Sequence, residues 1–225
     1  MRRATEAGLE GEIQPVEFES ELHYPGAPES LEAEGGRTIR RLKNAIARDP
    51  AFTDLLGLPI ISRGLQQLLG SQVIMPLAHH NCIMTKQPRY SSDTLWHQDI
   101  RYWSYQRSDL ISLWVALGEE QPQNGCLYVI PGTHRMQFDR SRMDDMLFLR
   151  PELPENRELI NKKIPVELSP GDFLLFHCKT FHAAGKNLTR ESKLSAVFTF
   201  RDQANLPTPG SRSAALPELL LPTPA

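Results

Sequence analysis

The sequence predicts a mostly β fold, a jelly-roll or barrel with a layer of helices outside it. A helical region comes first and a series of short strand-forming runs follows, an order typical of such folds. Asn124-Gly125 lies between two apolar runs and is a strong hairpin signal. Pro131-Gly132 and Pro170-Gly171 place proline and glycine where tight turns require them. At 225 residues without an internal repeat, the chain is expected to form one domain.

The helices are expected between about residues 37 and 70. Four apolar residues there fall at the spacing that lines one helix face: Ile39, Leu42, Ala45 and Ile46. Asp49-Pro50 is expected to close that helix, because a residue before proline disfavours helical backbone. Further short helices are expected up to Gly70, with a break at Gly57. The basic cluster at residues 37–43 is interpreted as the solvated face of the first helix.

Seven strands are predicted from apolar or alternating runs bounded by turn residues: 77–86, 94–99, 110–117, 126–130, 163–168, 172–177 and 193–201. Residues 1–36 are rich in Glu, Gly and Pro without a sustained period, so they are interpreted as an irregular segment. Residues 203–225 hold five prolines and are expected to form an extended tail or strap. The main domain is therefore placed at residues 37–202.

Composition and charge exclude several classes of partner. The formal net charge of −2 gives no electrostatic reason to expect nucleic acid or an anionic membrane surface. No stretch has the apolar length of a membrane span, and residues 1–14 lack the apolar segment of a signal peptide. The three cysteines, Cys82, Cys126 and Cys178, form no C-x-x-C pair. A reducing, cytoplasmic location is therefore expected.

His97 and Asp99 are the first candidates for a functional site. They stand one residue apart in a run predicted to be extended, so both side chains project from one face while Gln98 points away. A second histidine from the C-terminal half would complete a set of two imidazoles and one carboxylate. Such a set holds Fe(II) and leaves three coordination positions open. The His-x-Asp triplet alone is common by chance.

Four segments then follow one another in order: Trp96-His97-Gln98-Asp99, Asn124-Gly125-Cys126-Leu127, Pro131-Gly132-Thr133-His134, and Pro170-Gly171-Asp172 with the later run at 181–187. The series resembles the phytanoyl-CoA dioxygenase family of Fe(II)/2-oxoglutarate oxygenases over about residues 38–201. Lys86-Gln87-Pro88 and residues 48–52 are also similar to proteins of this family. The family's fold is a double-stranded β-helix, so the resemblance implies that form of jelly-roll.

The resemblance implies that His97, Asp99 and His182 are the metal ligands. His177 is the alternative to His182, because it also ends the strand that follows Pro170-Gly171. Relatives often carry a histidine that is not a ligand at the position of His177, so His182 is preferred.

Three further histidines are not assigned to the metal. His134 closes the Pro-Gly-Thr-His turn and is interpreted as structural. His79 and His80 are adjacent, and they would face opposite ways in an extended chain.

The cosubstrate 2-oxoglutarate carries a distal carboxylate, which needs a cation where it is buried. Family members usually place an arginine eleven residues after the distal histidine, and the resemblance assigns that role to Lys193. Lysine supplies the positive charge but lacks the two parallel N–H donors with which a guanidinium binds a carboxylate. Arg190 is a weaker alternative. Ala184 stands where relatives often have a small hydroxylic residue, which removes one hydrogen bond.

Three more residues are carried over from the resemblance as cosubstrate-binding positions. Trp114 matches a family position beside the cosubstrate, although a tryptophan in an apolar run is equally typical of core packing. Cys82 stands where relatives often have methionine, and Arg40 stands where they have a basic residue.

The resemblance implies a dioxygenase that uses Fe(II), 2-oxoglutarate and O2. It would hydroxylate or desaturate an unactivated C–H bond of a small-molecule substrate and release succinate and CO2. Asp99 argues against halogenation, because related halogenases replace this carboxylate with a small residue. Arg101, Tyr102 and Trp103 directly follow the metal motif and are expected to line the substrate site, with Arg101 suited to an anionic group. Aromatic residues at this point are equally compatible with core packing.

Two alternative functions remain open. Lys193 and Ala184, in place of the usual family residues, are compatible with a catalytically inactive jelly-roll binding module. A cupin-type metal oxygenase that does not use 2-oxoglutarate would share the metal site. The first 36 residues do not resemble the strand and helix with which relatives begin, so an exposed sheet edge is also expected.

Overall fold

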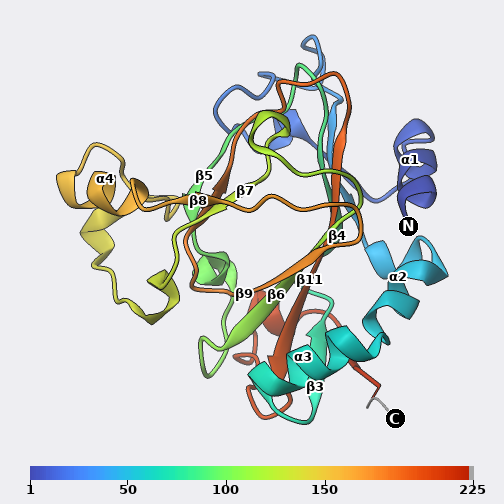
Figure 1. Cartoon of the computed structure of the whole chain (residues 1–225), viewed down its shortest axis with the longest axis vertical. Helices are drawn as coiled ribbons and strands as arrows, with labels where there is room; N and C mark the ends of the chain where they lie inside the picture. The colour runs from blue at the N-terminus through green and yellow to red at the C-terminus, as the bar shows by residue number, and fades with distance from the viewer. Residues whose placement is uncertain (223–225) are drawn as a thin grey trace.

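The computed structural model describes residues 1–222 and contains two antiparallel β-sheets that form a jelly-roll (Figure 1). The larger sheet has eight strands: β1 (Val16–Phe18), β2 (Ile39–Lys43), β3 (Val73–Pro76), β4 (Asn81–Lys86), β6 (Leu110–Ala116), β9 (Phe173–His177), β11 (Lys193–Asp202) and β12 (Glu218–Leu220). The smaller sheet has four strands: β5 (Thr94–His97), β7 (Leu127–Val129), β8 (Ile164–Pro165) and β10 (His182–Ala184). The predicted mostly β fold is therefore confirmed.

Within residues 1–222, four α-helices accompany the sheets: α1 (Arg2–Glu10), α2 (Pro50–Leu56), α3 (Pro59–Leu69) and α4 (Pro154–Ile160). Helix α3 packs on β3, β6 and β11 of the larger sheet, whereas α4 projects on the opposite side of the molecule, beyond β8 (Figure 1). None of the helices described here combines the length and the apolar character needed to cross a membrane.

Strand β11 is buried on both faces and separates two environments. It pairs with β4 over residues 193–198 and with β6 over residues 195–201. Since side chains alternate along a strand, those of one face enter the core covered by α2 and α3: Leu194, Ala196, Phe198 and Phe200. Those of the other face, Lys193, Ser195 and Val197, point into the space between the sheets. Complete burial of each large apolar side chain contributes about 1.5–3 kcal/mol.

The helix expected from residue 37 is wrong, because residues 39–43 form strand β2. This strand pairs with β1 on one side and with β4 on the other. Ile39 and Leu42 are buried in the core, and the Arg40 side chain is also buried, where it pairs with Glu19. The basic cluster is therefore not a solvated helix face. Sheet pairing and a buried ion pair outweigh the local helical spacing of the apolar residues.

Asp49 begins a helix instead of ending one. Its carboxylate accepts a hydrogen bond from the Ala51 N–H at 2.9 Å, and Pro50 occupies the first position of α2. A short acidic side chain before proline is a favourable start for a helix. The predicted short helices up to Gly70, with a break at Gly57, correspond to α2 and α3.

The two terminal segments contain more regular structure than their composition indicated. Residues 1–36 hold α1 and β1, and the three-residue strand β1 forms one edge of the larger sheet. In the C-terminal segment, β12 pairs with β3 and forms the other end of the strand order of the larger sheet. Residues 223–225 of that predicted segment lie outside the described residues. The boundaries at residues 36 and 202 stay predictions.

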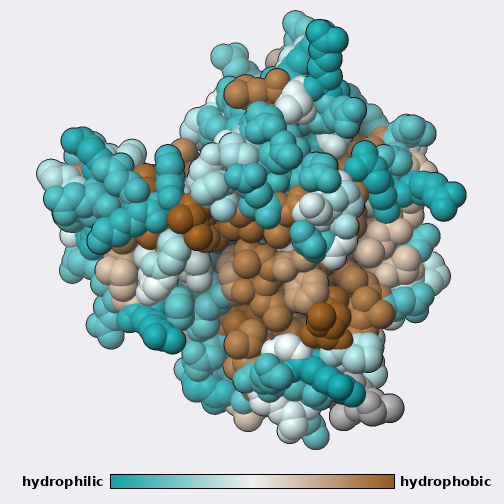
Figure 2. All heavy atoms as spheres, viewed as in Figure 1, coloured by the Kyte–Doolittle hydropathy of each residue, from teal (hydrophilic) through white to brown (hydrophobic). Residues whose placement is uncertain are grey.

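The surface in Figure 2 carries a band of apolar side chains across its centre, over β6 and β9 and towards α3. Phe173 and Leu175 of β9 are only partly buried, and they pack on the core below α3. The larger sheet is thus covered by helices over part of its outer face and more open beside them.

Candidate functional site

Three side chains from separate parts of the chain converge between the two sheets: His97, Asp99 and His182. Their ligand atoms all lie within 4.8 Å of one another. His97 ends β5 and is paired in register with His182 of the neighbouring strand β10. Gln98 stays extended, and Asp99 begins the short turn that follows β5. The Asp99 Oδ1 atom lies 3.5 Å from His182 Nε2 and 3.9 Å from His97 Nε2.

Backbone and side-chain hydrogen bonds fix the orientation of all three groups. His97 Nδ1 donates to the Leu95 carbonyl at 2.8 Å, and His182 Nδ1 donates to the Thr180 carbonyl at 3.0 Å. These bonds direct each Nε2 lone pair towards the shared centre. The Ser112 hydroxyl donates to Asp99 Oδ2 at 2.8 Å, which leaves Oδ1 facing the two imidazoles.

At His97 and Asp99, electrostatics favour the protonation states that a metal requires. Burial of His97 lowers its pKa well below the ordinary value, so the imidazole is neutral at pH 7. Burial of Asp99 would raise its pKa, but the imidazoles of His80, His182 and His97 and the bond from Ser112 outweigh it and lower the pKa to about 2. A buried carboxylate facing two imidazoles is the donor set of a two-histidine, one-carboxylate iron site.

The other histidines lie at different distances from this centre. His177, the alternative to His182, has its Nε2 3.6 Å from Asp109 Oδ1, and its ring lies 5.6 Å from that of His134. Neither ring lines the central cavity. His80 Nε2 does face the site, 3.9 Å from Asp99 Oδ1, while the adjacent His79 contacts the Ser213 hydroxyl at 2.9 Å. The two adjacent rings thus have separate partners.

A cavity of about 930 Å³ leads from the surface to the three converging groups. Its inner part lies between the sheets and is lined mainly by apolar and aromatic side chains: Cys82, Met84, Trp114, Leu127, Phe176 and Val197. Ala184 and two buried ammonium groups, those of Lys86 and Lys193, complete the inner end. Arg190, the weaker alternative to Lys193, is exposed and does not line the cavity.

Lys193 is paired with a carboxylate that sequence reasoning missed, that of Glu120. Lys193 Nζ lies 3.3 Å from Glu120 Oε2 and donates to Ser195 Oγ at 2.9 Å. The Trp114 indole N–H is shared between the two Glu120 oxygens at 2.9 and 3.1 Å, and the Ser195 hydroxyl donates to Oε1 at 2.6 Å. The Lys193 ammonium also lies 4.9 Å from the centre of the Trp114 ring. A buried glutamate four residues after an apolar strand has no distinguishing signal in one sequence.

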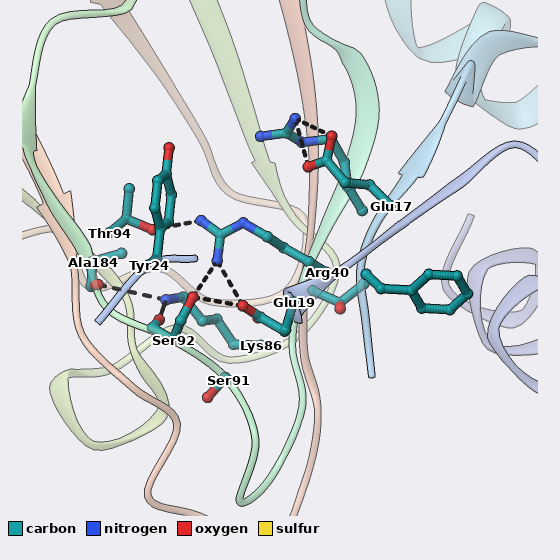
Figure 3. Close-up of polar contacts among 12 residues, drawn as sticks. Glu17, Glu19, Tyr24, Arg40, Lys86, Ser91, Ser92, Thr94 and Ala184 are labelled. Carbon is teal, nitrogen blue, oxygen red and sulfur yellow. Dashed lines mark hydrogen bonds and ion pairs between the residues drawn. The ribbon is translucent and has the colours of Figure 1, made fainter. Parts of the chain in front are cut away.

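Arg40 belongs to a second buried polar cluster, beside the first strands (Figure 3). Its guanidinium donates to Glu19 Oε2 at 3.0 Å, to Ser92 Oγ at 2.8 Å and to Thr94 Oγ1 at 2.7 Å. Lys86 lies beside the cluster and donates to the backbone carbonyl of Ser92 (Figure 3). Burial and the charge of Arg40 lower the pKa of Lys86 to about 7.

The outer part of the cavity contains the three residues that follow the metal motif. Arg101 donates to the Tyr24 hydroxyl at 3.2 Å, and its guanidinium lies over the Phe148 ring at 4.1 Å. Trp103 stacks on His79 with ring centres 4.8 Å apart. Tyr102 is 47% exposed, so it is surface and not core. All three predicted substrate residues therefore line the cavity.

Comparison with known sequences finds relatives that are phytanoyl-CoA dioxygenases or carry that domain. The family model of phytanoyl-CoA dioxygenase (PhyH) matches residues 20–195. A probable phytanoyl-CoA dioxygenase of Caenorhabditis elegans is 27% identical over 173 residues, which cover 69% of this chain and 52% of the relative. Phytanoyl-CoA dioxygenase domain-containing protein 1 of Rattus norvegicus is 25% identical over 177 residues, which cover 75% and 59%. The chain thus spans between half and two thirds of the length of these relatives.

Solved structures share the fold. EctD from S. alaskensis, crystallised with 2-oxoglutarate and 5-hydroxyectoine, superimposes with a TM-score of 0.73 at 21% identity, covering 92% of this chain and 68% of EctD. The α-ketoglutarate-dependent epimerase SnoN from nogalamycin biosynthesis gives a TM-score of 0.66 at 19% identity, covering 89% and 70%. With the family model matched over most of its length, this chain belongs to the phytanoyl-CoA dioxygenase family and has the double-stranded β-helix fold.

Proposed function

We propose that this chain is an Fe(II)- and 2-oxoglutarate-dependent dioxygenase that oxidises an unactivated C–H bond of a small molecule. The observation that carries the proposal is the buried convergence of His97, Asp99 and His182 at the end of a cavity, in a member of this family. In a structural metal site, a fourth protein ligand normally completes the coordination of the ion. His80 lies 3.9 Å from Asp99, but among residues 1–222 only His97, Asp99 and His182 have ligand atoms that all lie within 4.8 Å of one another.

The residues present fit iron as the metal. His97 and His182 offer Nε2, and Asp99 offers Oδ1, while Ser112 and two backbone carbonyls hold these groups in place. Iron and 2-oxoglutarate, when bound, supply the oxidising chemistry with O2, and succinate and CO2 are released. The protein's own contribution is to orient the three ligands and to keep water out of the inner cavity.

The inner end of the cavity fits the cosubstrate in shape and polarity. Trp114 and Cys82 form its walls, and Lys193 supplies an ammonium group next to Ser195. Arg40 lines the same cavity, but three side chains already hold its guanidinium, so we assign it to shaping the wall. EctD, a structural neighbour, was crystallised with 2-oxoglutarate, which supports the assignment of the cosubstrate.

The outer cavity favours a substrate that carries an anionic group. Arg101 and Arg212 both line it, and the Arg101 guanidinium donates to the Met146 carbonyl and the Tyr24 hydroxyl, neither of which carries a negative charge. Arg212 comes from the C-terminal segment, so the strap contributes to the substrate site. Trp103 offers a flat apolar surface between the mouth and the metal ligands. The three buried, free cysteines suit a reducing compartment, and we place the protein in the cytoplasm.

The test is metal-dependent turnover of 2-oxoglutarate. The purified chain, loaded with Fe(II), is expected to form succinate from 2-oxoglutarate even without its true substrate, and His97→Ala is expected to abolish this. His134→Ala is the matched control, because that ring lies outside the cavity. Absence of both metal binding and turnover would favour the inactive binding module. Metal-dependent oxygen uptake that ignores 2-oxoglutarate would favour a cupin-type oxygenase.

A further inference from the structure

The ammonium group expected to bind the cosubstrate already has a carboxylate partner in this chain. The side chains of Lys193 and Glu120 are 2% and 0% exposed, and they form an ion pair at 3.3 Å. Their charges cancel inside the protein. A second carboxylate brought to Lys193 would leave one negative charge in excess in a buried site, which is unfavourable.

Glu120 also accepts hydrogen bonds from two further donors next to Lys193. The Ser195 hydroxyl has one hydrogen, and it is directed to Glu120 Oε1 at 2.6 Å. The Trp114 N–H is shared by both oxygens of the same carboxylate. An arriving carboxylate thus finds the hydroxyl and the indole N–H already engaged and the ammonium already paired with a carboxylate.

The position of Glu120 is fixed by its backbone. Its N–H donates to the Leu168 carbonyl at 2.8 Å, and the Leu168 N–H donates back to the Glu120 carbonyl at 3.1 Å. The carboxylate therefore lies behind Trp114 and Lys193, which line the cavity, and their side chains together with the backbone hold it in place. Glu119, the adjacent residue, is exposed to solvent and provides a matched control of the same charge.

We infer that Glu120 is a specificity-determining residue for the cosubstrate. As an internal counter-ion of Lys193, it weakens the binding of 2-oxo acids with an anionic far end relative to those with a neutral far end. This inference rests on the proposed function. Glu120 acts through Lys193, Ser195 and Trp114 and does not take part in the chemistry.

The test compares two 2-oxo acids that differ only at the far end. 2-Oxoglutarate carries a carboxylate there, and 2-oxopentanoate carries a methyl group on the same five-carbon chain. Calorimetry on the full chain loaded with Ni(II), without oxygen, gives the two Kd values and their ratio. A role of Glu120 in folding alone would change both Kd values together and leave the ratio constant.

Glu120→Gln is expected to shift the ratio at least tenfold in favour of 2-oxoglutarate, whereas Glu119→Gln leaves it within twofold of wild type. Lys193→Arg is a second variant that keeps the buried charges balanced. Its five N–H donors can serve Glu120 and the cosubstrate together, so it is expected to move the ratio in the same direction. The double variant Glu120→Gln/Lys193→Met is expected to lose the preference for 2-oxoglutarate that Glu120→Gln gains alone.

Distinct outcomes separate this inference from the proposed function. A ratio unchanged in both Glu120→Gln and Lys193→Arg, with normal binding of both acids, would overturn the inference alone. Loss of 2-oxoglutarate binding in Lys86→Met but not in Lys193→Met would also overturn it, since it would place the far carboxylate on Lys86. Failure of wild type and all variants to bind any 2-oxo acid in the presence of metal would refute the proposed function.

Discussion

Replacing Lys193 with methionine is expected to lower the free energy of unfolding by about 3 kcal/mol. Removal of one partner from a buried ion pair typically costs about 3–5 kcal/mol, because the remaining charge is left without compensation. Glu120 would retain the hydrogen bonds from Trp114 and Ser195, so the lower end of that range applies. For a chain of this length the change corresponds to a decrease in Tm of about 6–12 °C.

Urea unfolding of the metal-free protein, followed by tryptophan fluorescence, measures this cost. Lys193→Met combined with Glu120→Gln removes both charges and is expected to return stability to within about 1 kcal/mol of wild type. Arg150→Met breaks an exposed pair with Glu152 and should cost less than about 1 kcal/mol. A cost below about 1 kcal/mol for Lys193→Met, or no recovery in the double variant, would refute the reasoning.

Three further predictions concern the metal centre and pH. His97→Ala is expected to abolish stoichiometric Ni(II) binding in calorimetry, while His134→Ala retains it; equal binding by both variants would contradict the ligand assignment. Ser112→Ala frees one oxygen of Asp99 and is expected to weaken Ni(II) binding about 10–100-fold, a change that Ser112→Thr should largely avoid. In the metal-free protein, the lowered pKa of His79 is expected to cost about 1–2 kcal/mol of stability from pH 7 to 5. Burial lowers the pKa of His79 to about 3. Below about pH 6.5 its imidazole is therefore protonated in the unfolded chain but stays neutral in the folded chain, which favours unfolding. His79→Gln should reduce this pH dependence in urea titrations, and an unchanged slope would contradict it.

Two of the candidate metal ligands, His97 and Asp99, were accessible from a short-range pattern, and the third, His182, was accessible from the family resemblance. The spacing of His97 and Asp99 and the ordered turn motifs pointed to one centre, and the structure places His182 opposite His97 on the adjacent strand. Strand β10 itself was missed, since a three-residue run ending in alanines carries no period that distinguishes it from a loop.

The parts that could not be predicted depend on partners distant in the chain. Strand β2 has apolar residues at helical spacing, and only its pairing with β1 and β4 shows it to be a strand. Glu120 lies 73 residues from Lys193, and one sequence gives no indication that the two side chains meet. Tertiary contacts of this kind outweigh local propensity and charge pattern.

The length of strand β11 can change little without disturbing both the core and the cavity. Deleting one residue near its start would move a leucine into the ammonium position and turn charged or hydroxylic groups towards the phenylalanines under the helices. A change of cosubstrate preference is therefore expected from exchange of side chains such as Lys193 and Glu120, and not from a change in the length of this strand.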